Sequence, residues 1–262
     1  PDPVDFSFIN PHPTSVPVYD PTTSNPFQID FRSSNLSDLD LSNSLSLLDL
    51  SSFDSKTIWP AAVKLPSGFS SQQVMELGKN PGLGIRALHT KGINGKGVGI
   101  AIIDQTLLVD HQEYANQIRI YEEAADVVEG WQETSMHGPA VASIAVGKTV
   151  GVAPESDLYF IAMGGCFETS VNEEFKFYCL AKDILRVIEM NNSLPEGRKI
   201  RVLSMSIGWS PQDKGFAEMN SAVEKAKEAG IFVVSSSLST TYGFNFQGMG
   251  RDFQSDPDDF SS

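Results

Sequence analysis

Two side chains with acid–base chemistry, Asp104 and His137, stand out near the middle of this 262-residue sequence. Asp104 directly follows residues 98–103, a short β-branched apolar run beside glycines, which predicts a strand buried on both faces of a parallel sheet. A carboxylate there lies at the carboxyl end of its strand, where open α/β sheets place ligands and catalytic groups. Together with the imidazole of His137, such a carboxylate could do acid–base chemistry.

The elements around this pair predict an α/β fold. His137 opens a run of small residues at 138–145 that suits a helix packed closely against a sheet, and Pro139 is tolerated in a first helical turn. Further buried strands are expected at 157–162, 200–207 and 231–234, and helices at 72–92 with a break at Pro81-Gly82, at 171–191 and at 216–229.

Five segments in order resemble the subtilisin-like serine peptidases, or subtilases. They are Asp104 with His111 seven residues on, His137-Gly138-Pro139-Ala140-Val141-Ala142-Ser143 against the family's H-G-T-H-V-A-G, G-V-A-P-E-S-D-L-Y at 151–159, S-M-S-I-G at 204–208, and the helix and strand at 222–237. The resemblance covers roughly residues 81 to 240.

The resemblance implies a three-layer, mostly parallel sheet flanked by helices, and a serine endopeptidase that acts on polypeptides without a cofactor. It assigns Asp104 and His137 to the catalytic pair and implies a structural role for His111. It also implies that Ser206, Ile207 and Gly208 pair with the substrate backbone. Trp209 departs from the family's usual small residue, and it either narrows the specificity pocket or packs as a rim aromatic.

A competing alignment concerns Ser135. Thr134-Ser135-Met136 with Pro139 also fits the family's nucleophile motif G-T-S-M-A-x-P. Its position just before the G-V-A-P segment is where the family has its histidine, so we prefer His137 as the general base.

Three departures from the family pattern leave the activity open. Gln105 and Thr106 replace the usual small residues after the aspartate. Ser239 stands where the family has the asparagine of the oxyanion hole, with Asn245 as an alternative donor. No nucleophile motif follows residue 240. The chain is therefore either a serine peptidase whose serine lies in a missing C-terminal part, which we prefer, or a non-catalytic peptide-binding relative.

The first 60 residues predict an extension separate from a catalytic domain at 61–262. Residues 1–30 are rich in proline and polar residues, as in an irregular arm. The following Ser/Leu/Asp-rich tract has leucines that keep neither a helical nor a strand period, and we expect it to lay them on the main domain.

Bulk properties exclude several classes of partner. The net charge of −14 disfavours nucleic acid and anionic membranes. No apolar run is long enough to span a membrane, and the four histidines show no metal-ligand spacing, so we expect no metal. Cys166 and Cys179 either pair or remain free thiols. Acidity, few cysteines and the resemblance suggest an extracellular or cell-surface protein.

Overall fold

A five-stranded sheet organises the larger of two compact units. The larger unit comprises Gly84–Met249, and the smaller comprises Asp2–Leu83 and Gly250–Ser262. The computed structural model describes residues 11–23, 28–124, 136–163, 177–236 and 256–259. All neighbouring strands run parallel, in the order β2-β3-β1-β4-β5. The strands are β1 (Gly99–Asp104), β2 (Ile118–Glu123), β3 (Asp157–Ala162), β4 (Ile200–Met205) and β5 (Phe232–Ser235).

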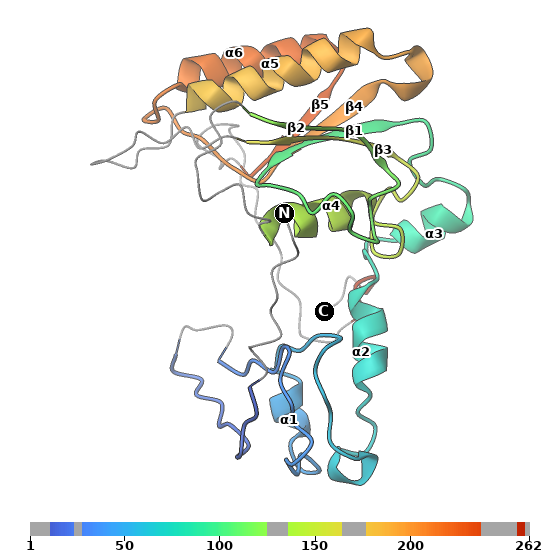
Figure 1. Cartoon of the computed structure of the whole chain (residues 1–262), viewed down its shortest axis with the longest axis vertical. Coiled ribbons are helices and arrows are strands. Elements are labelled where there is room, and N and C mark those ends of the chain that lie inside the picture. Colours follow the sequence, from blue (N-terminus) through green and yellow to red (C-terminus); the bar gives the residue numbers. More distant parts are fainter. Residues whose placement is uncertain (1–10, 24–27, 125–135, 164–176, 237–255, 260–262) are drawn as a thin grey trace. The chain divides into compact units, whose positions relative to one another are not determined.

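Helices cover both faces of this sheet, as Figure 1 shows. On one face lie α5 (Phe177–Ser193) and α6 (Phe216–Glu228), and on the other lies α4 (His137–Val146). Two separate clusters of buried side chains fill the spaces between the sheet and these layers. The arrangement confirms the predicted three-layer α/β fold.

The predicted strands agree with the observed ones within two residues at each end. The helix expected at 216–229 ends at Glu228, and the helical segment with a break consists of α2 (Ser71–Gly78) and α3 (Ile85–Thr90). The described part of α5 starts at Phe177, so the first residues of the helix predicted from 171 lie outside the described residues. Strand β2 was not predicted. Part of its sequence is charged and it lies at the sheet edge, so it lacks the apolar run of a central strand.

The smaller unit contains a coil with a five-residue repeat. Asp30, Asn35 and Asp40 each accept a hydrogen bond from the backbone N–H two residues on, at 3.0 Å. The residue after each of them, Phe31, Leu36 or Leu41, is buried. Turn bonds then recur with the same spacing, from the N–H groups of residues 34, 39 and 44 to the carbonyls of 31, 36 and 41.

A second rung of the coil lies parallel to the first. Asp30 pairs with Ser52 and Asn35 with Ile58, and the short helix α1 (Leu45–Leu48) links the rungs. Leu36, Leu39, Leu41 and Leu48 are therefore buried in a core of their own, whereas Leu45 and Leu50 are exposed. The expectation that the leucines cover the main domain was wrong, because a repeat of five turns the buried ones toward the coil axis. The domain boundary predicted at residue 60 falls inside this smaller unit.

Further contacts hold the rest of the smaller unit together. The turn η1 (Ala62–Lys64) closes the second rung through a bond from the Leu41 N–H to the Lys64 carbonyl. The rings of Phe53, Trp59 and Phe69 pack together, with centroids 5.1–6.3 Å apart. Phe53 meets the other two edge to face, and Trp59 and Phe69 are tilted against each other. Leu83 and Asn80 bond to Pro257 and Asp258. No helix among the described residues is long and apolar enough to cross a membrane.

Candidate active site

The carboxylate of Asp104 is fixed at the carboxyl edge of the central strand. Asp104 pairs in register with Ala162 of β3, and its carbonyl accepts the Met163 N–H at 2.8 Å. Its Oδ1 accepts the backbone N–H of Gln105, also at 2.8 Å. The side chain is only 3% exposed, so a charge there requires donors from the protein.

His137 supplies one such donor as the first residue of α4. Its Nδ1 lies 2.6 Å from Asp104 Oδ1, although the two residues are 33 positions apart in the sequence. The imidazole is 47% exposed, so the ring is only partly buried beside the carboxylate. In the tautomer whose Nδ1–H group donates a hydrogen bond to Asp104, Nε2 carries the lone pair and can act as a base.

Gly138 lets the helix come this close to the strand end. A Cβ atom at this position would meet the carbonyl oxygen of Thr106 at 2.6 Å and that of Gln105 at an even shorter distance. In the sequence, Gly138 was recognised only as one position of the family motif, and this steric requirement was not predicted. The signal was available, because a glycine beside the histidine in a small-residue helix indicates a close backbone approach.

His111 has a structural environment, as the resemblance implies. Its Nδ1 accepts the Glu113 N–H at 3.3 Å, and its ring stacks on Tyr114 with centroids 5.0 Å apart. Burial raises the pKa of Tyr114, so the ring behaves as a neutral core aromatic. Glu113 binds the loop after α4 through Thr149, whose N–H and hydroxyl donate to its carboxylate at 2.8 and 2.7 Å.

The predicted substrate-binding residues directly follow β4, the strand beside Asp104. Ser206 is exposed, Gly208 is half-buried and Ile207 packs partly on the core beneath α5 and α6. Trp209 is buried in that same core, and its indole Nε1 donates to Asn220 Oδ1 at 2.9 Å. Of the two interpretations of Trp209, the structure therefore supports a packed aromatic.

Several candidate residues fall outside the described residues, namely Ser135, Ser239, Asn245 and Cys166. Cys179, at the start of α5, is disulfide-bonded. Across the described ranges there is no group of three or more His, Cys, Asp or Glu side chains that could hold a metal ion.

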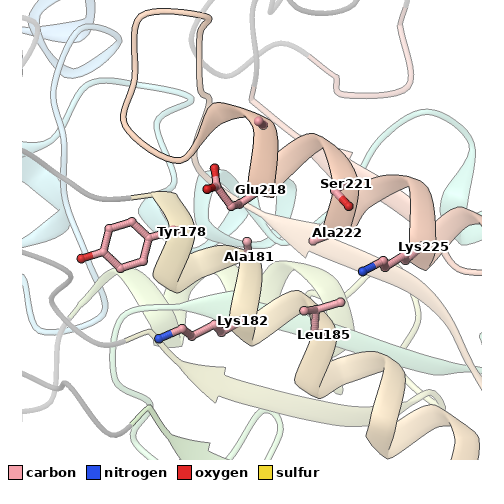
Figure 2. Close-up of a pocket in the computed structure, with 9 residues that line it drawn as sticks. Tyr178, Ala181, Lys182, Leu185, Glu218, Ser221, Ala222 and Lys225 are labelled. Atoms are coloured by element: carbon pink, nitrogen blue, oxygen red, sulfur yellow. The ribbon is translucent and has the colours of Figure 1, made fainter.

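A groove of about 450 Å³ lies between α5 and α6, on the opposite side of the sheet from α4. Its lining includes Tyr178 and Lys182 of α5 and Glu218 and Lys225 of α6 (Figure 2). The groove contains neither Asp104 nor His137, so the candidate catalytic pair does not lie in this hollow.

Comparison with known proteins identifies the family of the region that contains the sheet. A family model described as "Subtilase family" matches residues 95–239. The "Major intracellular serine protease" of Bacillus subtilis (strain 168) is 25% identical over 186 residues, which cover 66% of this chain and 53% of that protein.

Two solved structures are also similar to this chain. One is the prenylagaramide maturation protease PagA, with 16% identity, a TM-score of 0.43, and coverage of 58% of this chain and 50% of that one. The other is the epidermin leader peptide processing serine protease of Staphylococcus aureus, with 17% identity, a TM-score of 0.41, and coverage of 59% and 41%. This chain thus spans about half the length of its relatives. Because the family model matches more than half of the chain, this chain belongs to the subtilase family of serine peptidases.

Proposed function

We propose that this chain forms part of a subtilase-type serine endopeptidase, in which Asp104 and His137 act with a serine contributed from outside the chain. The observation that carries the proposal is the 2.6 Å contact between a buried carboxylate and a half-exposed imidazole at the edge of the sheet. This arrangement suits proton transfer between a nucleophile and a leaving group on the exposed side of the ring.

The reaction would be acyl transfer from a peptide bond to water. The serine hydroxyl attacks the carbonyl carbon while His137 Nε2 takes its proton, and His137 then gives that proton to the departing amine. Water repeats the sequence on the acyl-enzyme and releases the second peptide. Asp104 keeps the imidazole in the required tautomer and stabilises the imidazolium, since its carboxylate is held by Gln105 and has little contact with water.

The substrate would lie along the segment that follows β4. Ser206, Ile207 and Gly208 offer backbone groups to an extended polypeptide one strand away from Asp104. Ser239 remains the candidate for an oxyanion donor, with Asn245 as the alternative. Loss of an asparagine donor typically lowers turnover about 10²- to 10³-fold, so a serine here predicts a slow enzyme.

The nucleophile is the part of this proposal that the chain does not supply. Since its relatives are about twice as long as the matched region, a later segment of the same polypeptide is the proposed source. The 262-residue chain by itself is then expected to hydrolyse nothing.

A fluorophosphonate probe, which labels activated serines, tests this directly. The product of the complete reading frame should be labelled, and His137→Ala should abolish labelling while Ser135→Ala leaves it unchanged. Asp104→Asn should lower the labelling rate by about 10⁴-fold, as expected when the imidazole loses its required tautomer. Labelling of the 262-residue chain that disappears in Ser135→Ala would overturn the assignment of His137. Complete absence of labelling, with intact folding, would favour the non-catalytic peptide-binding alternative.

A further inference from the structure

Two turns that lie far apart in the sequence interlock within the smaller unit. The side-chain amide of Asn80 donates to Asp258 Oδ2 at 2.9 Å, although the two residues are 178 positions apart. The Leu83 N–H donates to the Pro257 carbonyl at 3.3 Å. Gly82 is buried against the same proline, since a Cβ atom there would meet the Pro257 carbonyl oxygen at 2.7 Å and its Cβ at 2.9 Å. We refer to this contact, between residues 80–83 and 256–259, as the latch.

Both turns of the latch are braced by bonds of their own. Asn80 Oδ1 accepts the Gly82 N–H at 3.2 Å, so one amide side chain holds its own turn and also reaches the partner turn. In the partner turn, Asp256 Oδ1 accepts the Asp258 N–H at 2.9 Å. Pro257 occupies the second position of this turn, where its fixed φ suits a tight turn. The two turns therefore lose little conformational freedom when they meet.

The latch lies at a strained stretch of backbone. Gly82, Leu83 and Gly84 have positive φ angles of 75°, 53° and 72°. Glycine adopts this left-handed conformation without strain, whereas leucine seldom does. A strained conformation of this kind persists where surrounding contacts enforce it. Leu83 is 72% exposed and has little packing of its own, so its backbone bond to Pro257 supplies such a contact.

Both chain crossings between the two units lie beside the latch in the sequence. The chain passes from the smaller unit to the larger between Leu83 and Gly84, and it returns between Met249 and Gly250. The first crossing lies within the left-handed stretch 82–84, and the second comes shortly before residue 256. A change of backbone conformation at Leu83 would therefore redirect the chain where it enters α3.

We propose that the latch is a conformational switch for the junction between the two units. When it is engaged, it fixes the direction in which the chain enters α3 and restricts the motion of one unit relative to the other. When it is released, Leu83 returns to an ordinary backbone conformation and the two units move independently. The contacts of the latch are few and partly exposed, so it can open while both hydrophobic cores stay folded. The inference does not depend on the proposed function, because neither Asp104 nor His137 takes part.

Distances between two spin labels on the 262-residue chain test the switch. One label is attached to the coil through Ser37→Cys and the other to α6 through Glu228→Cys, both at exposed positions. Double electron–electron resonance then gives the distribution of distances between the two units. We expect one narrow distribution with the latch intact, and one at least about twice as wide after Gly82→Ala, because units without a fixed junction move freely. A broad distribution with the latch intact, or an equally narrow one after Gly82→Ala, would overturn the proposal.

Gly68→Ala is the matched control for backbone strain. Gly68 belongs to the same unit and has a φ of +85°, but a Cβ atom there meets nothing within 4 Å. Both substitutions therefore force alanine into a left-handed conformation, and only Gly82→Ala also pushes Pro257 away. The control should keep the narrow distribution. An equal widening in Gly68→Ala would show that the latch does not govern the motion, and would count against the proposal.

A second variant, Asn80→Ala, decides the matter if Gly82→Ala fails to fold. It removes the amide that joins the two turns and adds no clash. Hydrogen exchange of the Leu83 amide should become faster by about fivefold or more, the factor that corresponds to the loss of one net hydrogen bond. Asn43→Ala, at an exposed asparagine of the coil, should leave that exchange rate unchanged. An unchanged Leu83 exchange rate in Asn80→Ala, together with a narrow distance distribution, would refute the latch.

Discussion

Replacement of Gly138 by alanine tests whether the close approach of α4 to the strand end positions the catalytic imidazole. The added methyl group would sit 2.6 Å from the Thr106 carbonyl oxygen, and closer to that of Gln105. Carbon–oxygen contacts normally begin near about 3.3 Å, so relief of the Thr106 contact alone requires the start of α4 to move by about 0.7 Å, and relief of the Gln105 contact requires more. If that shift separates the pair, the bond from His137 to Asp104 lengthens from 2.6 Å to about 3.3 Å or more, beyond the usual hydrogen-bond range of about 3.2 Å.

Two opposing terms set the expected change in stability. Overpacking against backbone atoms typically costs about 1–3 kcal/mol, and alanine is about 1 kcal/mol better than glycine inside a helix. Because both opposing atoms are backbone carbonyls that cannot rotate away, the steric term should win. We expect Gly138→Ala to lower the free energy of unfolding by about 1–2 kcal/mol.

Urea denaturation of the 262-residue chain measures this change, and the NMR signal of the His137 Nδ1 proton reports the bond to Asp104. Gly197→Ala is the matched control, since a methyl group there meets no atom within 4 Å. In the complete protein, the same displacement should lower kcat/KM by at least about tenfold, given that a 1 Å misplacement can cost about 10²-fold. If Gly138→Ala matches the control in stability and keeps the proton signal, the close approach does not position His137.

Three further predictions concern other parts of the molecule. Leu36→Ala should destabilise the coil by about 2–5 kcal/mol in urea denaturation, whereas Ser37→Ala, at the solvent-facing position beside it, should change little. Glu113→Gln should cost about 0.5–1.5 kcal/mol at pH 7, with Gln112→Ala as a near-neutral control. Burial acts to raise the pKa of Glu113, but hydrogen bonds led by Thr149 outweigh it and lower the pKa. The Glu113 contribution should therefore be complete above its unfolded pKa of about 4.3 and decline as the pH falls through the lower folded value, which denaturation at pH 7 and pH 3 would detect. Trp209→Phe should destabilise the chain by about 1–3 kcal/mol, because Asn220 loses its buried donor, and a melting temperature equal to that of the unaltered chain would contradict the contact.

The central strands could be predicted because each depends on local sequence, and the Asp–His contact could be predicted from the resemblance to a known family. An uninterrupted β-branched run allows few structures other than a buried strand, and the spacing of the family motifs relates Asp104 to His137. Strand β2 was missed because it is a strand through its pairing at the edge of the sheet, which its amino-acid composition does not indicate. Its Ile118, Tyr121 and Glu123 acquire their conformation by pairing with β3.

The five-residue coil was missed for a different reason. The spacing of Leu36, Leu39 and Leu41 fits neither the period of a helix nor that of a strand, and the segment is in fact neither. The informative signal lay in the polar residues, since Asp30, Asn35 and Asp40 recur every five positions and start each turn. Trp209 illustrates a third limit. Sequence alone could not distinguish a pocket wall from a packed aromatic, because that choice depends on the position of Asn220 on α6.

The coil also has consequences for how this segment can change in evolution. One rung spans about 22 residues, the separation between Asp30 and Ser52, and each rung contacts only its neighbour. Insertion of a complete rung would leave every buried leucine pointing toward the coil axis. Insertion of one or two residues would instead rotate all later leucines away from that axis. Natural length variants of this region should therefore differ by whole rungs, and shorter insertions should be confined to the turns.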